Sequence, residues 1–381
     1  MMRQLRFRFL HLAILIISIC FYLKYRRVSN IQNFLNEQSK IIFNDQIQIN
    51  EYKEQFRKVF SNMNESSMPP AILLLNKYAL NITLNFLCNV RQFPGVIEQI
   101  VAVVFDSYSH QVLKESFPEM GGVIFWNIPA LEEKFTSGDG RYQLFQYFRS
   151  KLASLLTETT NQFWMVQADT IWKKNLFEII DLESEEFIEA TLIFDSEGSE
   201  GLLGSMIAGG YFFVRSSNST KKFFEASADF LLDHFATDNN VMTRQCIQQD
   251  FGVNCAQIKY SIISNWRIFS NKKEIKEDEE GPNLFQLDGG DGTNDKFNKM
   301  KSQGFLYVDI NSVVNSEKQQ TIKCLPEYLI KTNIKECFNN EKNVLLSLIH
   351  NVFEFVCLQF PQLKHFLLTK LFPYYAAYLF I

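Results

Sequence analysis

Three aspartates, Asp106, Asp169 and Asp195, each follow a run of apolar, β-branched and aromatic residues that is predicted to be a buried strand. Ligands of open α/β sheets bind beyond the carboxyl ends of the strands. Carboxylates placed there can hold a divalent cation that neutralises a diphosphate. An aspartate after a strand also commonly caps the next turn or helix. Three of them together favour an acidic cluster over three separate caps.

Strand-like and helical runs alternate through the middle of the chain. The predicted strands are 97–105, 122–126, 163–167, 187–194, 210–214 and 305–310. The predicted helices are 141–157, 219–235 and a helix from Asp238, as its N-cap, through Gln248. This alternation predicts an α/β sandwich with a mostly parallel central sheet.

The composition excludes several classes of protein. The chain has 381 residues, of which 46% are hydrophobic and 21% charged, as in a globular protein with a sizeable core. The net charge is −4, and no basic stripe lies outside the N-terminus, which argues against nucleic-acid binding. No CxxC, GxSxG or HExxH motif is present, and no acid pair typical of a glycosidase stands out.

The N-terminus carries an apolar run, 9–23, with basic residues on both sides. A signal anchor fits better than a cleaved signal peptide, because Ser18 and Cys20 make a poor cleavage site. The flanking charges are balanced, but a short tail before a long body favours a lumenal body, in a single-pass type II protein of the Golgi or ER membrane. The predicted parts are a tail 1–8, the anchor 9–23, a polar stalk 24–68, a lumenal domain 69–340 and an apolar C-terminal segment 341–381.

Sequons and cysteines bear on the lumenal placement. Three possible N-glycosylation sites support it: Asn64, Asn81 and Asn218. In an oxidising compartment the cysteines nearest in sequence, Cys246 with Cys255 and Cys324 with Cys337, are candidates for disulfides. The alternative for Cys88 and Cys357 is that they are buried thiols.

Several segments resemble a known family when taken in order. FWMVQADTIWKKNLFE at 163–178 resembles the DxD region of GT-A-type glycosyltransferases, and most closely that of the nucleotide-diphospho-sugar transferase family. Further resemblances to the family's motifs lie at 73–96, 207–225, 237–242, 261–269 and 284–292. The resemblance implies a GT-A-like, Rossmann-type fold and transfer of a sugar from a nucleotide-diphosphate donor, with a UDP-sugar preferred. The acceptor would be a hydroxyl of a glycan, protein or lipid.

The chain departs from the DxD pattern, because Gln167 stands where the family has its first aspartate and Asp169 keeps the second. The resemblance implies a divalent metal, Mn²⁺ by preference, held by Asp169. No histidine lies where the family has a late metal ligand, and Asp288 and Asp291 are oxygen donors that could take its place. Gln167 brings no charge but could bond a ribose hydroxyl. Such a site either binds its metal weakly or does without one. The departure at Gln167 also motivates an alternative function, a catalytically inactive lumenal relative that binds or scaffolds.

The resemblance also implies roles for other residues. The expected nucleotide and diphosphate contacts are Asp106, Arg149 and Lys151; the expected acceptor side is Gly209, Gly210 and Trp266; the catalytic candidates are Asp238 and Asp195. Each has a structural alternative: a helix cap for Asp238, a solvated helix face for the two basic residues, a tight turn for the glycines and a core position for Trp266.

Overall fold

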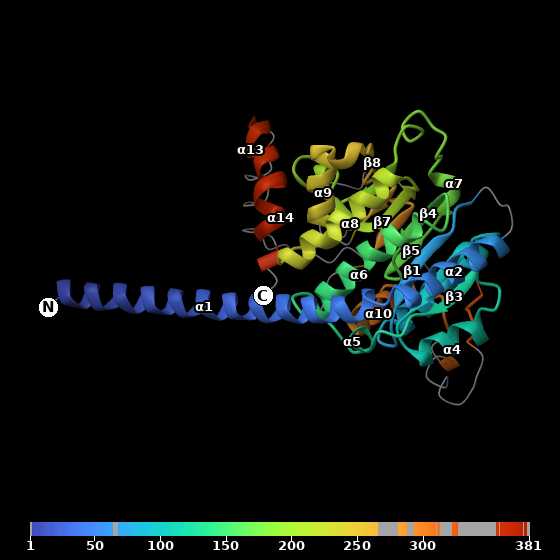
Figure 1. The fold of residues 1–381 in the computed structure, drawn as a ribbon, viewed down its shortest axis with the longest axis horizontal. Helices are drawn as coiled ribbons and strands as arrows, with labels where there is room; N and C mark the ends of the chain where they lie inside the picture. Colours follow the sequence, from blue (N-terminus) through green and yellow to red (C-terminus); the bar gives the residue numbers. More distant parts are fainter. Residues whose placement is uncertain are drawn as a thin grey trace.

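The computed structural model describes residues 2–63, 68–265, 281–287, 293–309, 311–312, 322–326, 356–357, 359–375 and 377–378 (Figure 1). The helices are α1 Met2–Phe43, α2 Gln46–Asn62, α3 Leu80–Val90, α4 Ser107–Ser116, α5 Pro129–Glu132, α6 Gly140–Leu156, α7 Leu176–Ile179, α8 Asn218–Asp233, α9 Asp238–Gln248, α10 Thr293–Ser302, α13 Pro361–Phe366 and α14 Phe372–Tyr375, with a π-helical stretch Leu367–Leu371 between the last two. The strands are β1 Ala71–Leu75, β2 Ile100–Val104, β3 Gly122–Phe125, β4 Gln162–Val166, β5 Thr170–Trp172, β6 Leu192–Ser196, β7 Ile207–Arg215, β8 Cys255–Ile258, β9 Ile263–Ser264 and β10 Leu284–Gln286.

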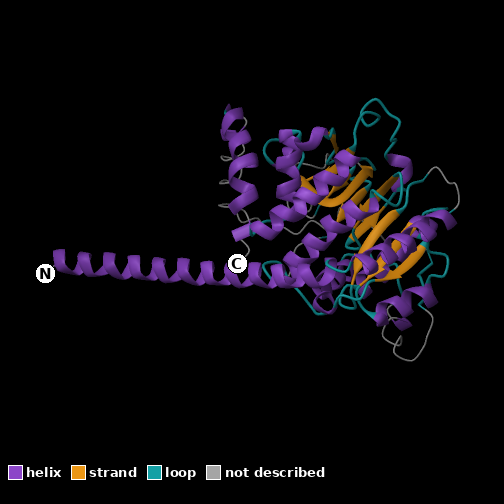
Figure 2. Cartoon of the chain, viewed as in Figure 1, coloured by secondary structure: helices purple, strands orange, loops and turns teal. Residues whose placement is uncertain are grey.

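The central sheet has the strand order β3-β2-β1-β4-β7-β6-β8 (Figure 2). Only β7 runs against its neighbours, β4 and β6, and every other pair is parallel. The predicted α/β fold with a mostly parallel sheet is therefore confirmed. A small second sheet, β5-β10-β9, was not predicted, and it lies directly after the segment that carries Asp169.

Apolar side chains alternate along each strand and fill a core on each face of the sheet. On β2, Ile100, Ala102 and Val104 belong to the core shared with α3, whereas Val101 and Val103 belong to the core shared with α6 and α8. The sheet thus lies between two layers of helices, and its carboxyl edge stays open to side chains from the loops.

The segment predicted as a stalk instead forms part of the domain. The C-terminal half of α1 and all of α2 pack on the sandwich, with Leu35 and Phe56 fully buried. Tyr52 of α2 stacks on Trp126 with ring centroids 3.9 Å apart. The prediction of a separate stalk at 24–68 is wrong because its few apolar residues recur at helical spacing and make one buried face.

Two further predictions need correction at strand boundaries. β6 begins only at Leu192, because Phe187 closes a turn with Ser184 and its carbonyl accepts from Arg215. Of the predicted strand 305–310, the described residues make a single bridge, from Val308 to Cys324.

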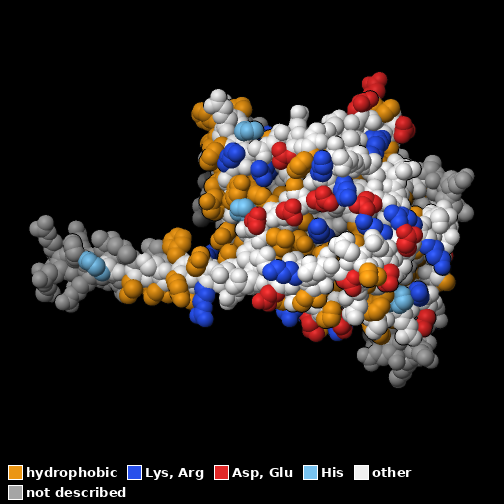
Figure 3. All heavy atoms as spheres, in the orientation of Figure 1, with side chains coloured by type: hydrophobic (Ala, Val, Ile, Leu, Met, Phe, Trp, Pro, Cys, Tyr) orange, Lys and Arg blue, Asp and Glu red, His pale blue; other side chains and the backbone are white. Residues whose placement is uncertain are grey.

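The C-terminus lies beside the middle of α1, whereas the N-terminal end of that helix lies far from the domain (Figure 1). α1 projects from the domain, and its exposed part carries apolar side chains, among them Ile19, Phe21 and Leu23 (Figure 3). Among the described residues, no helix has the length and apolarity that a membrane span requires. Near the C-terminus, Ala377 packs against Val28 of α1, so the described part of 341–381 is docked on the domain.

Two disulfides join distant or neighbouring segments. Cys246 bonds Cys255, the pair of nearest neighbours that the sequence put forward. Cys324 bonds Cys88 of α3 across 236 positions, so the alternatives of a Cys324–Cys337 bond and of a buried Cys88 thiol are wrong. Spacing along the chain favoured the wrong partner because the fold brings α3 beside the segment 322–326.

Candidate functional site

The carboxyl edge of the sheet gathers polar residues from several elements. Because β6 runs parallel to β4 and β7 runs against both, the ends of β4 and β6 and the start of β7 share this edge. The segment after β4 brings Gln167 and Asp169, β6 brings Asp195, and β7 brings Gly209 and Gly210. Asp169 and Asp195 thus share the β4–β7–β6 part of the edge, but the predicted acidic cluster of three aspartates is not formed, because Asp106 follows β2, two strands from β4.

Asp169 is buried and already has a cationic partner. Its Oδ2 lies 2.6 Å from Nζ of Lys296 in α10, and its Oδ1 accepts a bond of 3.3 Å from Nε2 of Gln286. The same amide nitrogen of Gln286 also donates to Oε1 of Gln167. The Leu287 N–H bonds the Asp169 carbonyl at 2.7 Å, which ties this loop to β10. Gln167, Asp169, Gln286 and Lys296, here called the QDQK cluster, therefore form one hydrogen-bonded unit.

Two asparagines of helix α3 hydrogen-bond the chain shortly after Asp169 and shortly after Lys296. Asn89 binds both backbone groups of Trp172, accepting from its N–H at 2.7 Å and donating to its carbonyl at 2.9 Å. One turn earlier, Asn85 donates to the Phe305 carbonyl and accepts from the Tyr307 N–H. Because Asn85 takes these backbone groups, residues 305–307 do not pair as the predicted strand.

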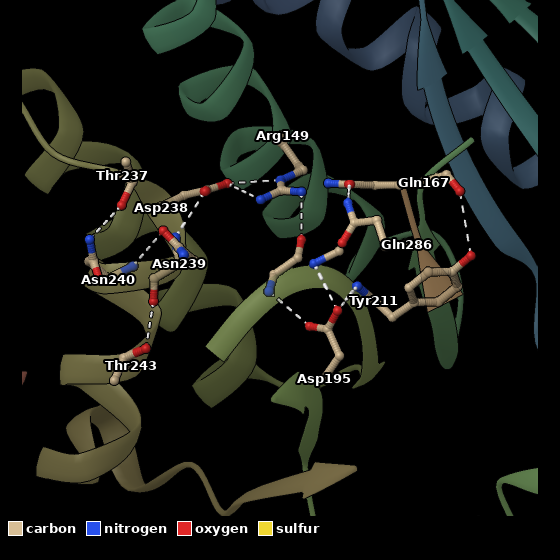
Figure 4. Close-up of polar contacts among 12 residues, drawn as sticks. Arg149, Gln167, Asp195, Tyr211, Thr237, Asp238, Asn239, Asn240, Thr243 and Gln286 are labelled. Carbon is tan, nitrogen blue, oxygen red and sulfur yellow. Dashed lines mark hydrogen bonds and ion pairs between the residues drawn. The ribbon is translucent and has the colours of Figure 1, made fainter. Parts of the chain in front are cut away.

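Arg149 of α6 and Asp238 of α9 form a buried ion pair (Figure 4). Their side chains are only 9% and 3% exposed, and Nε of Arg149 lies 2.8 Å from Oδ2 of Asp238. Arg149 Nη1 also donates to the Gly209 carbonyl at 2.7 Å. Thr237 is the N-cap of α9 and Asp238 its first residue, so the predicted cap is one position off. The guanidinium therefore links α6, α9 and the Gly209 segment of β7, and its expected role as a diphosphate ligand stays a prediction.

Asp195 fixes the start of β7. It accepts backbone N–H bonds from Gly209 at 2.8 Å, from Gly210 at 3.1 Å and from Tyr211 at 3.0 Å (Figure 4). Burial raises its pKa to about 7, although these donors lower it. A Cβ on Gly210 would lie 2.7 Å from Oε1 of Gln286 and 3.0 Å from Oδ2 of Asp195. The two glycines lie within β7 at a point of close approach rather than in the alternative tight turn, and Asp195 positions their backbone.

Tyr142 of α6 is a titratable group whose pKa responds both to the Arg149–Asp238 ion pair and to Lys296 of the QDQK cluster. It lies seven residues before Arg149 on the same face of α6, with Gln146 between them. Burial raises the pKa of Tyr142, Asp238 raises it further, and the positive charges of Arg149 and Lys296 act in the opposite direction. The hydroxyl thus stays protonated and able to donate a hydrogen bond.

Asp106 lies at the carboxyl end of β2, two strands from β4. Its Oδ1 caps α4 by accepting from Ser109 N–H at 2.7 Å, which is the structural alternative that the sequence allowed. Its Oδ2 is buried and has no hydrogen-bond partner among the described residues. One oxygen of Asp106 therefore remains for a ligand at this edge.

The remaining predicted site residues lie elsewhere or outside the described part. Lys151 lies over the ring of Phe43 in α1, on a different face of α6 from Arg149, so it does not join the site. Asn81 is half-buried at the start of α3, and Asn218 is exposed at the start of α8. Four predicted residues fall outside the described residues: Asn64, Trp266, Asp288 and Asp291.

The described part of the site contains only one of the three expected metal ligands, Asp169. Among the described side chains, no three of His, Cys, Asp and Glu gather in a metal-binding arrangement. Asp169 is neutralised by Lys296, and Gln286 presents its N–H to Asp169 where a cation needs a lone pair. The expectation of a metal at Asp169 stays a prediction, since the other two expected ligands, Asp288 and Asp291, lie outside the described residues.

Sequence reasoning missed Lys296, Tyr142 and the two asparagines of α3. Gln286 lies inside the quoted segment 284–292, so the resemblance marked its neighbourhood but not its role. The spacing of Tyr142, Gln146 and Arg149 along one helix face was a usable signal. Lys296 has no such signal, because 127 positions separate it from Asp169.

Comparison with known proteins identifies the family. The profile of the nucleotide-diphospho-sugar transferases matches residues 95–300, more than half of the chain. The chain therefore belongs to the nucleotide-diphospho-sugar transferase family, as its motifs predicted. No curated protein matches the chain.

Solved structures similar to this chain share little sequence with it. The apo structure of mouse xyloside xylosyltransferase 1 is 10% identical, with a TM-score of 0.38, over 57% of this chain and 96% of that one. The galactosyltransferase LgtC, solved with donor and acceptor sugar analogues, is 10% identical, with a TM-score of 0.40, over 58% and 87%. The apo structure of the bifunctional glycosyltransferase WbbM is 11% identical, with a TM-score of 0.39, over 62% of this chain and 50% of that one.

Proposed function

We propose that the chain is a glycosyltransferase that moves a sugar from a nucleotide-diphosphate donor to a hydroxyl acceptor. The observation that carries this proposal is the QDQK cluster, which lies inside the family's matched region and at the ligand-binding edge of the sheet. In the transfer, the bond between the anomeric carbon and the diphosphate breaks, and its electron pair stays on the diphosphate. The acceptor oxygen forms the new bond and loses its proton.

The chain's own residues supply position and charge for this reaction. The buried Oδ2 of Asp106 would accept a hydrogen bond from the nucleotide, and Gln167 and Asp169 lie after β4, two strands away. Asp238 is committed to Arg149 and therefore positions the Gly209 segment rather than acting as a base. Alignment of reactants and stabilisation of the leaving diphosphate are the main sources of acceleration in such reactions.

A panel of UDP- and GDP-sugars tests the proposal by release of the nucleoside diphosphate. Asp169→Ala should lower the rate by about a hundredfold or more, because it disconnects Lys296 and Gln286 from the loop. Asp233→Ala, at an exposed position in the last turn of α8, is the matched control and should leave the rate unchanged. Full activity of Asp169→Ala would contradict the assignment.

A non-catalytic binding protein is the second candidate. The substitution of an amide for the first carboxylate, and the engagement of both Gln167 and Asp169 with protein groups, favour it. Nucleoside diphosphate that raises the thermal stability while no sugar in the panel is released or transferred would support this candidate.

We also propose that the body is lumenal and anchored through 9–23 in the Golgi or ER membrane. The apolar side chains of α1, the two disulfides and the exposed sequon at Asn218 support this placement. In secretory cells the full chain should lose mass on endoglycosidase treatment, and Asn218→Gln should reduce that loss. A chain of unchanged mass that alkaline carbonate extracts from membranes would contradict it.

A further inference from the structure

We propose that the helical stretch 361–375, here called the C-terminal helix, lies flat on the surface of a lipid bilayer beside α1. The inference rests on the proposed anchoring through 9–23 and gives a function to the apolar end of the chain. It starts from four large apolar side chains in or next to the C-terminal helix that are open to solvent. They are Phe360 at 60% exposed, Leu363 at 37%, Phe366 at 51% and Tyr375 at 60%.

The surroundings of α1 change near Lys24. Just before it, Phe21, Tyr22 and Leu23 are each more than half exposed. Because successive helical positions point in different directions, this part of α1 presents apolar side chains on several sides. From Val28 onward, by contrast, α1 buries one face against the domain. A helix that is apolar on several sides is better suited to lipid than to water.

The C-terminal segment meets α1 at this same level. Nζ of Lys24 donates to the Tyr378 carbonyl at 3.2 Å, and Ala377 packs against Val28. From there α14 and α13 run across the direction of α1, on the side of the domain that faces the N-terminal part of α1 (Figure 1). Hydrophobic atoms gather on this side of the domain (Figure 3). A bilayer entered by α1 up to Lys24 would therefore meet the C-terminal helix at its surface.

The domain holds the C-terminal helix in this position. Leu367 and Leu368 are buried together with Leu202, which precedes β7. The ring of Tyr374 packs edge-on against Phe230 of α8, with centroids 5.1 Å apart. Since these residues already attach the helix to the domain, the exposed apolar side chains have no further face of the domain to cover.

The charges of this segment favour a lipid surface over a second copy of the chain. Residues 355–381 contain two lysines, Lys364 and Lys370, and no aspartate or glutamate. In a symmetric dimer the same patch faces itself, so the lysines of two copies would meet without an acidic partner from this segment. Lipid headgroups offer phosphates instead. Lysines reach such phosphates while neighbouring aromatic rings enter the boundary of the acyl chains.

Photo-crosslinking of the full chain in phosphatidylcholine vesicles tests the inference. A p-benzoylphenylalanine is placed at Phe360 or at Phe366, and lipid adducts are measured by mass spectrometry after illumination. We expect about tenfold more adduct than with the same group at Tyr108. Tyr108 is the matched control, since it is 41% exposed and lies on α4, far from the N-terminal part of α1 (Figure 1). Adduct no higher than at Tyr108 would overturn the inference.

A second measurement asks whether the apolar side chains themselves make the contact. Phe360→Ser combined with Leu363→Ser should lower the lipid adduct at position 366 by about fivefold or more. Both side chains are exposed, so the thermal unfolding temperature should stay unchanged. Ile47→Ser combined with Ile188→Ser changes two apolar residues that are exposed elsewhere, and it should leave the adduct unchanged. Equal adduct in the two double variants would contradict the proposal.

The outcomes separate this inference from the proposed anchor and the proposed function. Full chain that floats with the vesicles but forms no lipid adduct at Phe360 and Phe366 would overturn the inference and leave the anchor intact. Crosslinks to a second chain in place of lipid would also overturn it and assign the surface to a dimer. Full chain that does not float would overturn both the inference and the anchor. Release of nucleoside diphosphate, measured in detergent, reports on the transferase proposal independently of all three.

Discussion

The two charges of Arg149 and Asp238 are tolerated in the protein interior because each satisfies the other. Removing one partner leaves the second charge buried without compensation, at a cost of about 3–5 kcal/mol. We expect Arg149→Met to lower the free energy of unfolding by that amount in urea titrations. Lys151→Met, two residues along the same helix but outside the site, should cost less than about 1 kcal/mol. Equal effects of the two substitutions would show that the pair contributes nothing specific.

Asp195 should give the stability a characteristic pH dependence. Burial raises its pKa from 3.8 to about 7 in the folded chain. The folded chain thus keeps a proton that the unfolded chain releases, so the stabilisation is complete below pH 3.8 and is lost as pH rises towards 7. The free energy of unfolding should fall across this window by roughly 4 kcal/mol at most from this group. Urea unfolding at several pH values, compared with Asp195→Asn, checks this, and equal slopes would contradict it.

Single residues were only partly predictable from the sequence. The sequence correctly predicted Asp195 at the end of a strand and Asp238 at the start of a helix, because strand ends and helix starts can be recognised from local pattern. Their roles could not be predicted, since the sequence does not distinguish a carboxylate that accepts backbone N–H bonds, such as Asp195, from one that pairs with arginine, such as Asp238. The partners, Gly209 and Arg149, come from other elements of the fold.

At the scale of elements, α2 should behave as part of the core. Phe56 is fully buried, so Phe56→Ala should cost about 3–5 kcal/mol of unfolding free energy. Ile47 is on the same helix but 74% exposed, and Ile47→Ala should cost less than about 0.5 kcal/mol. Denaturant unfolding of both variants compares them directly. A Phe56→Ala variant as stable as the wild type would contradict the assignment of α2 to the core and favour a separate stalk.

The strands were predicted better than α2 for a physical reason. Apolar runs such as 100–104 lie in the buried centre of the sheet and exclude polar residues on both faces. α2 buries only one stripe, Ile49, Tyr52 and Phe56, within a polar segment, so its average composition resembles that of a linker. The small sheet of β5, β10 and β9 escaped prediction because its strands are two or three residues long.

At the scale of the whole molecule, the two disulfides should contribute unequally. In the chain-entropy description a cross-link stabilises by restricting the unfolded chain, and its effect grows with the loop that it closes. The loops here are 236 and 9 positions long. Cys324→Ser should therefore cost ~3 kcal/mol more than Cys255→Ser in unfolding free energy, measured without reductant. A larger loss for Cys255→Ser would contradict this order.

Helix α3 should keep the distance between Lys296 and Asp169 constant. Within two turns of α3, Asn89 hydrogen-bonds the strand that follows Asp169. Asn85 hydrogen-bonds the chain that follows Lys296, and Cys88 is joined to that chain by a disulfide. Helix α3 therefore positions both the segment that carries Asp169 and the segment that carries Lys296, although these segments are far apart in sequence. Small distortions of the sheet would move the Asp169 carboxylate and the Lys296 ammonium together, so the distance between them would change little.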